Sequence, residues 1–180
     1  MRSFAFIVVP YERTTSFLKG AGEGPGAFLR DWEYLVSQGE VPGPAAIARI
    51  SGKACSSPPR MISAVEDAVA AAVNEDLFPV LLGGEHTAIL GAVTALAGRG
   101  GGMGVVQLDA HADLRNSYQG SRYSHASVMR RIVDDLGLPL LPVGIRAFSR
   151  QEGEFMKERK LNVQAGLDQA VSFSKEGKSR

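Results

Sequence analysis

Three side chains able to bind a metal ion follow one short apolar segment near the middle of the chain. Val105 to Leu108 has the composition of a buried strand, and Asp109, His111 and Asp113 come after it at alternate positions. Alternate residues of an extended backbone project from one face, so we expect the three side chains to converge above the carboxyl end of the strand. Parallel α/β sheets bind ligands at that end. Two carboxylates and an imidazole favour a divalent ion such as Mn2+ over a metal that prefers thiolates.

The same pattern also fits a polar turn in which aspartate and histidine cap the next helix, so it leaves two interpretations open. A second segment favours the metal site. An apolar run beginning at Phe78 ends in Gly-Gly-Glu-His at 83–86, where two glycines allow a tight turn with close backbone approach. A lone His86 would more often be a helix-start residue, but here it follows a second predicted strand. Histidine is scarce, because the only other two are His111 and His125.

Three ordered segments carry a resemblance to a known family. They are Gly-Gly-Glu-His at 83–86, Asp-Ala-His-Ala-Asp at 109–113 and Tyr-Ser-His-Ala-Ser at 123–127. Together they resemble the ureohydrolase family of arginases and agmatinases. The stretch from Asp113 to His125 is similar to the prokaryotic agmatinase branch more than to the arginases. The opening of the chain, at 9–16 and 24–25, also resembles that family, so the similarity covers about residues 4–160.

The resemblance implies a centre of two manganese ions. It assigns His86 and Asp113 to one ion and His111 to the second, with Asp109 as the bridge between them. In a complete family member, two such ions make hydroxide available at neutral pH. By resemblance, that hydroxide attacks agmatine to give urea and putrescine, a step of polyamine biosynthesis.

The resemblance also places two residues on the substrate side of this centre. His125 is the expected proton shuttle for the leaving amine, since histidine titrates near neutral pH. Ser121 falls where the family has a polar residue facing the substrate. Arginine is the less expected substrate, whereas aminopropylagmatine, guanidinobutyrate and other small guanidino compounds stay open.

One part of the family pattern is absent from the 180 residues. Ureohydrolases supply further metal ligands in a later motif of the form S-x-D-x-D-x-x-D-P, and nothing after Asn162 matches it, since Asp168 has no second aspartate two residues on. We therefore expect 1–180 to be the N-terminal portion of a single ureohydrolase-like domain, with an irregular tail at 164–180 and an impaired metal centre that holds fewer ions. The alternative is a non-catalytic remnant, or one half of a split hydrolase that acts as a binding partner.

Alternating strands and helices predict an α/β fold, a three-layer α/β/α sandwich with a mainly parallel sheet, arginase-like and incomplete at the C-terminus. In the family's sheet order, two strands that this sequence lacks separate the strand before Gly83 from the strand before Asp109. We therefore expect two unpaired strand edges. Strands are expected at 4–9, 80–83, 105–108 and 138–145, and helices at 25–38, 58–76, 87–96, 126–136 and 152–160.

Composition narrows the partners and the compartment. With 44% hydrophobic residues, 22% charged residues and a net charge of +1, the chain offers no basis for binding nucleic acid or a membrane. The basic residues of 157–160 are balanced by Glu152, Glu154 and Glu158, which predicts a solvated helix face. The single Cys55 and the absence of a run of ~20 apolar residues predict a cytoplasmic protein. The expected protein partner is a second copy or a complementary C-terminal segment.

Overall fold

The computed structural model describes residues 2–100, 102–162, 166, 168–169 and 172–173. The chain forms two compact units, Met1–Ala95 and Leu96–Arg180. Most of the tail expected to be irregular, at 164–180, lies outside the described residues. Of the described helices, none is long and apolar enough to cross a membrane.

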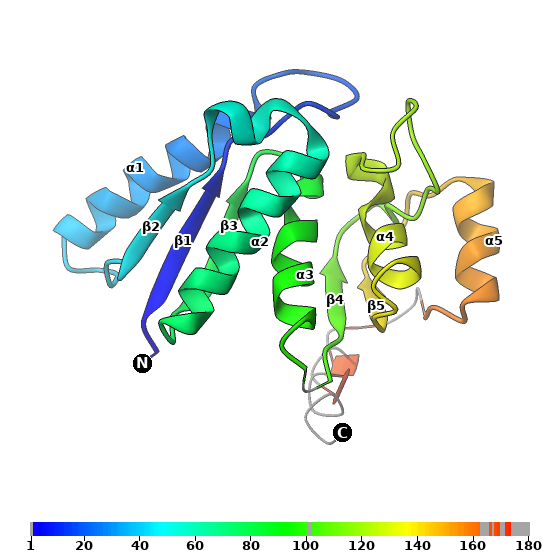
Figure 1. Cartoon of the computed structure of the whole chain (residues 1–180). Helices are drawn as coiled ribbons and strands as arrows, with labels where there is room; N and C mark the ends of the chain where they lie inside the picture. The colour runs from blue at the N-terminus through cyan, green and yellow to red at the C-terminus, as the bar shows by residue number, and fades with distance from the viewer. Residues whose placement is uncertain (1, 101, 163–165, 167, 170–171, 174–180) are drawn as a thin grey trace. The chain divides into compact units, whose positions relative to one another are not determined.

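The first unit is built on a three-stranded parallel sheet of order β2-β1-β3 (Figure 1). The central strand is β1 (Phe4–Val9), and its neighbours are β2 (Ala46–Arg49) and β3 (Phe78–Gly83). Every residue of β1 after Phe4 is buried, as expected for a central parallel strand with both faces covered. Pro79, which has no N–H to donate, lies in β3, at one edge of this sheet, where proline is tolerated.

Helix α1 (Gly24–Ser37) follows a 3-10 turn, η1 (Ala21–Glu23), and has Pro25 in its first turn, where proline suits the start of a helix. It packs through Leu29 against the face of β1 that carries Phe6 and Val8. Trp32 meets Phe6 edge-to-face, with ring centroids 5.4 Å apart. These apolar contacts hold α1 beside the carboxyl end of β1.

Two further helices complete the first unit. Helix α2 (Pro58–Asn74) follows a second 3-10 turn, η2 (Gly52–Ser56), and buries Met61, Val65 and Val69, residues spaced four apart as one helix face requires. Figure 1 shows α2 running in front of the strands. The turn η3 (His86–Ala88) leads into α3 (Ile89–Ala97).

The second unit has a two-stranded parallel sheet, β4 (Val105–Leu108) and β5 (Leu140–Val143), with Val105 opposite Leu140. A 3-10 turn, η4 (His125–Ser127), precedes α4 (Val128–Asp134). Helix α5 (Arg150–Glu158) begins with a capping box in which Ser149 and Glu152 bond reciprocally.

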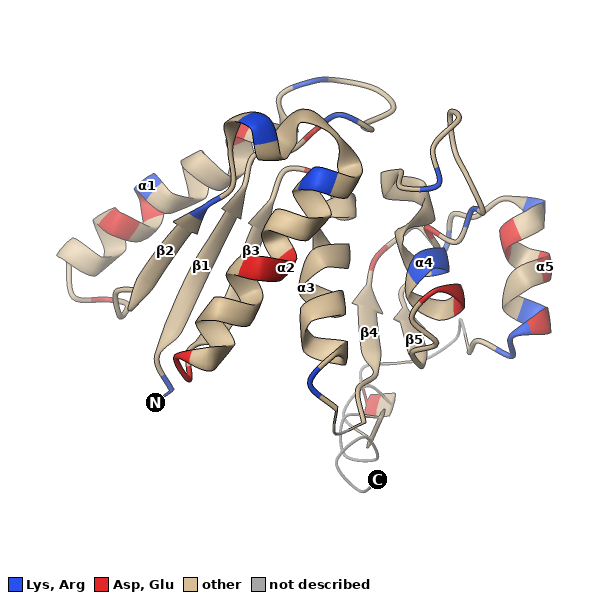
Figure 2. Ribbon diagram, viewed as in Figure 1, with Lys and Arg blue, Asp and Glu red and all other residues tan. Residues whose placement is uncertain are grey.

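The predicted α/β class and parallel strands are confirmed, and so are the two unpaired edges. Within the part of the chain that the structure describes, β3 and β4 each pair with one strand only. Strand β2 was not predicted. Acidic and basic residues are interspersed along α5 (Figure 2), but the prediction of a solvated face is wrong for Glu152, which is 4% exposed. The reason is that Glu152 turns inward to cap its own helix and to bond the loop after β4.

Candidate metal centre

The first unit contributes His86, which begins η3 directly after the turn that ends β3. Close backbone approach, expected for both glycines of the motif, is found at Gly84. A Cβ atom on Gly84 would lie 2.6 Å from the carbonyl oxygen of Tyr11 and 2.9 Å from the Cα of Gly22. A Cβ on Gly83 would meet its nearest atom at 3.4 Å, an ordinary contact. The half-buried His86 therefore follows a turn that is pressed against the segment after β1.

The carboxylate of Glu85 fixes this turn. Glu85 is buried and accepts hydrogen bonds from the backbone N–H of Thr14 at 2.7 Å, from the hydroxyl of Thr14, and from the hydroxyl of Thr87 at 2.7 Å. A buried carboxylate is stable only when donors satisfy its oxygens in this way. The residue beside His86 is thus tied both to its own helix start and to a segment 71 residues earlier in the chain.

The segment after β1, to which Glu85 is bonded through Thr14, also contains hydrogen bonds of its own, which Glu12 accepts. The carboxylate of Glu12 accepts hydrogen bonds from the backbone N–H groups of Gly20 at 2.7 Å and Gly22 at 2.9 Å. These backbone hydrogen bonds, with that of Gly22 first, lower the pKa of Glu12, because they favour the charged form. The chain between β1 and α1 is therefore a bonded loop in contact with the Gly84 turn.

The second unit contributes Asp109, His111 and Asp113, all on the loop that follows β4. The backbone N–H of His111 donates to Oδ1 of Asp109 at 2.9 Å, and the same oxygen lies 3.6 Å from Nδ1 of His111. Asp113 is buried and has a φ of 50°, and its carbonyl accepts the N–H of Met129 at 3.0 Å. Strand β4 ends at Leu108, but His111 still forms a parallel bridge with Ala147, and carboxylate oxygens of Asp109 and Asp113 lie within 4.8 Å of each other. That the three side chains share metal ions stays a prediction. The His111 side chain is 69% exposed and that of Asp109 27%.

Two buried polar residues hold this loop in place. The side chain of Gln107, on β4, donates to the carbonyl of His111 at 2.9 Å. Glu152 accepts the backbone N–H of Leu114 at 3.0 Å, and so joins α5 to the residue after Asp113. Neither residue was predicted from the sequence to support the site. For Glu152 a signal was present, because Ser-x-x-Glu at 149–152 has the form of a capping box.

His125, the predicted proton shuttle, lies in η4 against the ring of Tyr118. The two rings meet edge-to-face with centroids 5.7 Å apart, and Oγ of Ser124 lies 3.4 Å from Nδ1 of His125. The backbones of Tyr118 and Ser121 exchange hydrogen bonds of 2.9 and 3.0 Å. The hydroxyl of Ser121 accepts the N–H of Tyr123 at 3.1 Å. Ser121 therefore stabilises the turn that places the ring of Tyr118 against His125.

A buried arginine ties the same turn to α4. Arg131 is 4% exposed and donates to Oδ1 of Asn116 at 3.0 Å and to Oδ1 of Asp135 at 3.4 Å. Arg122 also pairs with Asp135, at 2.8 Å. Burial lowers the pKa of Arg131, and the neighbouring Asp135 opposes that shift. Residues 116–122 are thereby held at both ends, by Arg131 of α4 and by Asp135, which follows that helix.

The structure therefore brings Asp109 and His111 together and sets His125 against Tyr118. His86 lies at the carboxyl end of β3 in the other unit. That His86 shares a metal ion with the residues after β4 stays a prediction.

Comparison with known families decides the relationship. The sequence model of the Arginase family matches residues 2–170. The chain belongs to the arginase family. It is 35% identical over 169 residues to the N(1)-aminopropylagmatine ureohydrolase of Synechocystis, a match covering 87% of this chain and 55% of that protein. It is 28% identical over 174 residues to the agmatinase of Pyrococcus horikoshii, covering 86% and 56%.

A solved structure agrees with the family. The agmatine ureohydrolase of Thermoplasma volcanium superposes with a TM-score of 0.81 at 28% identity, covering 98% of this chain and 64% of that one. The predicted ureohydrolase membership and arginase-like fold are thus confirmed. The chain spans about half the length of the curated relatives it matches.

Proposed function

We propose that this chain carries the first part of the active site of an agmatinase-like ureohydrolase, a metal-dependent hydrolase of small guanidino compounds. The observation that supports the proposal most directly is the pair Asp109 and Asp113 on one loop, which offer carboxylate oxygens within 4.8 Å of each other, in a chain of the arginase family.

The donor set fits manganese. His86, Asp109 and Asp113 can each offer one ligand atom, and His111 is the further nitrogen ligand in the proposed centre. Carboxylate oxygens and imidazoles suit Mn2+, whereas the chain's one thiol, Cys55, lies in η2 and has no part in the proposed centre. When bound, the metal supplies the Lewis acidity that makes hydroxide available from water near neutral pH.

His125 is proposed to deliver the proton that the leaving amine needs. An imidazole is the side chain best suited to exchange a proton near neutral pH. The edge of Tyr118 and the nearby hydroxyl of Ser124 limit the orientations of its ring. We assign Tyr118 as a positioning residue, since it acts through His125, and Ser121 as a residue that shapes the turn and lies on the substrate side.

Two substrates are proposed, agmatine and N(1)-aminopropylagmatine. The second is slightly favoured by identity, because relatives named N(1)-aminopropylagmatine ureohydrolase match at 34–36%, against 28–33% for relatives named agmatinase. Both substrates carry the same guanidinium group and differ only in the amine end. Parallel assays with the two compounds, scored by the ratio of their kcat/KM values, separate these assignments.

A complementary segment is proposed to complete the centre. The family motif S-x-D-x-D-x-x-D-P does not occur in these 180 residues, so His86, Asp109, His111 and Asp113 alone leave the ions under-coordinated. Because misplacing catalytic groups by ~1 Å can cost about 100-fold in rate, loss of whole ligands costs more. We expect negligible turnover by this chain alone.

The experiment measures urea release by the purified chain with Mn2+ and either substrate, with and without a C-terminal family segment supplied in trans. We expect activity only with the segment, and its loss in Asp109→Asn and His125→Asn. The matched control is Asp76→Asn, an exposed aspartate that pairs with Arg2 outside the proposed site. Robust turnover by the chain alone would show that the missing motif is dispensable. A segment that binds and restores nothing favours the non-catalytic alternative.

A further inference from the structure

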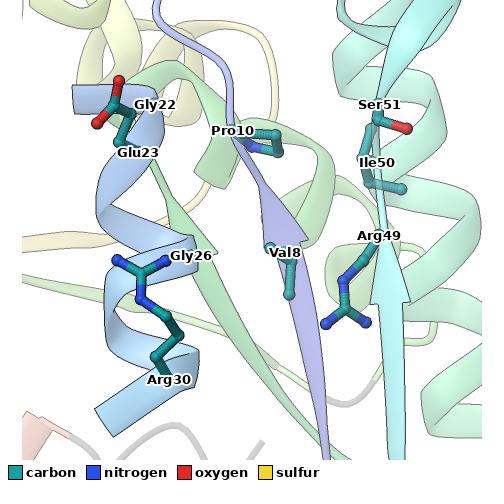
Figure 3. A pocket seen from close by; sticks show the side chains of 9 residues that line it. All are labelled: Val8, Pro10, Gly22, Glu23, Gly26, Arg30, Arg49, Ile50 and Ser51. Carbon is teal, nitrogen blue, oxygen red and sulfur yellow. The ribbon is translucent and has the colours of Figure 1, made fainter. Parts of the chain in front are cut away.

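The first unit contains a cavity of about 450 Å3 between α1 and β2, distinct from the motif residues (Figure 3). Its walls come from the carboxyl ends of β1 and β2, from η1 and from the first turns of α1. Two arginines line it, Arg30 and Arg49, together with the hydroxyl-bearing Ser51. Figure 3 shows the two guanidinium groups on either side of Val8.

The fold explains why both arginines face this cavity. Arg49 ends β2 and is paired with Val8 of β1. Cross-strand partners point to the same face of a sheet, so Arg49 projects to the face on which α1 packs. Arg30 lies one helical turn after Gly26, which also lines the cavity. A Cβ on Gly26 would lie 3.7 Å from Nη1 of Arg30, so the glycine leaves the guanidinium room.

The arginines are not engaged elsewhere. Within the residues that the structure describes, the side chains of Arg30 and Arg49 form no hydrogen bond or ion pair, whereas Arg122 and Arg159 of the second unit both pair with aspartates. Glu23 is the only acidic residue that lines the cavity, so its lining carries a net positive charge. The two guanidinium groups give the cavity ten N–H donors, which outnumber the acceptors that Glu23 and Ser51 offer.

We propose that this cavity binds a small organic anion. A guanidinium group presents a planar fork of donors that matches carboxylate and phosphate oxygens, which explains a pair of arginines. The apolar lining from Val8, Pro10 and Ile50 suits a carbon skeleton. A volume of about 450 Å3 falls within the range of small-molecule sites, roughly 300–1,000 Å3, and exceeds the needs of inorganic phosphate.

The positive charge of the lining also indicates that this cavity does not bind the substrate of the proposed reaction. Guanidino substrates with a second amine are dications, and the arginine pair repels them. The cavity is therefore a second site, for a ligand opposite in charge to the substrate. None of the proposed metal ligands lines the cavity, so a test of anion binding does not depend on the proposed function.

Calorimetric titration of the full 180-residue chain tests this site with glycerol 3-phosphate, glutarate, inorganic phosphate and agmatine as probes. We expect saturable binding of at least one organic anion, and none of agmatine when no metal is added. Arg30→Gln and Arg49→Gln should each weaken the affinity at least 10-fold. The matched control is Arg60→Gln on α2, whose guanidinium donates to Ser56 and does not line the cavity. The preferred probe identifies the head group as phosphate or carboxylate.

Equal affinity in the wild type and both variants would overturn the proposal, and so would failure of both organic anions to bind at millimolar concentration. A second measurement requires no variant. On titration with the bound probe, amide resonances of Gly22, Gly26 and Ser51 should shift more than those of α2. A titration in which these three amides stay unmoved while binding is detected would place the anion elsewhere.

Discussion

Replacing Gly84 by alanine should loosen the turn that carries His86. The added methyl carbon would lie 2.6 Å from the carbonyl oxygen of Tyr11, 2.9 Å from the Cα of Gly22 and 3.1 Å from the carbonyl oxygen of Ala21. All three are backbone atoms, so no side-chain rotation relieves the overlap. Overpacking of this kind costs about 1–3 kcal/mol, and the loop held by Glu85 must move away from the turn.

Gly83→Ala is the matched control, one residue away in the same motif. Its methyl would meet Cβ of Ala88 and the carbonyl oxygen of Glu85 at 3.4 Å, which is van der Waals contact. We expect this variant to change the free energy of unfolding by less than about 1 kcal/mol, since its strand backbone accepts alanine.

Urea unfolding followed by tryptophan fluorescence measures both variants. The chain has 1 tryptophan, Trp32, and it packs in the aromatic cluster of the first unit, so the signal reports the unit that contains Gly84. Mn2+ affinity, measured by calorimetry, should fall for Gly84→Ala and stay unchanged for Gly83→Ala. Equal stability of the two alanine variants would refute the argument that the Gly84 contact constrains this turn.

Three further outcomes are expected. Burial raises the pKa of Tyr11 to about 12. Ionisation of its hydroxyl therefore favours the unfolded chain from pH 10 upward and lowers the free energy of unfolding by up to about 2–3 kcal/mol at pH 12. Tyr11→Phe should abolish this loss in urea titrations at high pH, and should be neutral or stabilising at pH 7 because the hydroxyl has no hydrogen-bond partner among the described residues. Glu152→Gln should lower stability by about 1–3 kcal/mol, since its carboxylate serves both the helix cap and Leu114, and amide exchange should show faster opening at Leu114. Asp109→Asn should weaken Mn2+ binding in calorimetry more than His125→Asn does, and the reverse order would contradict the assignment of Asp109 as a ligand.

The sequence predicted those parts of the fold that depend on local composition. The strands at Phe4–Val9 and Val105–Leu108 have the predicted bounds, because uninterrupted apolar runs are typical of buried parallel strands. Strand β2 was missed, since Ala46–Arg49 is not an uninterrupted run of large apolar residues and is defined by its pairing with β1. Short edge strands of this kind leave little trace in composition.

The candidate site was predicted as a set of residue types but not as a geometry. Asp109, His111 and Asp113 were found by their spacing, and the carboxylates of Asp109 and Asp113 lie near each other. The hydrogen-bonded turn at Asp109 and the left-handed backbone of Asp113 were not predicted. Glu85 and Glu152 were missed as positioning residues, because a buried carboxylate and a solvated one look alike in a sequence. Their partners lie 71 and 38 residues away, so only the folded chain brings donor and acceptor together.

The buried carboxylates have a consequence for protein engineering. Grafting Gly-Gly-Glu-His onto another parallel α/β scaffold would import a glutamate whose hydrogen-bond donors belong to Thr14 and Thr87, both outside the copied motif. The transplanted glutamate would then be buried without donors, at a cost of several kcal/mol. A graft of Asp-Ala-His-Ala-Asp meets the same difficulty without Gln107 and Glu152. The smallest unit that can be transplanted is therefore each motif together with the residues, near and far in the sequence, that form hydrogen bonds to it.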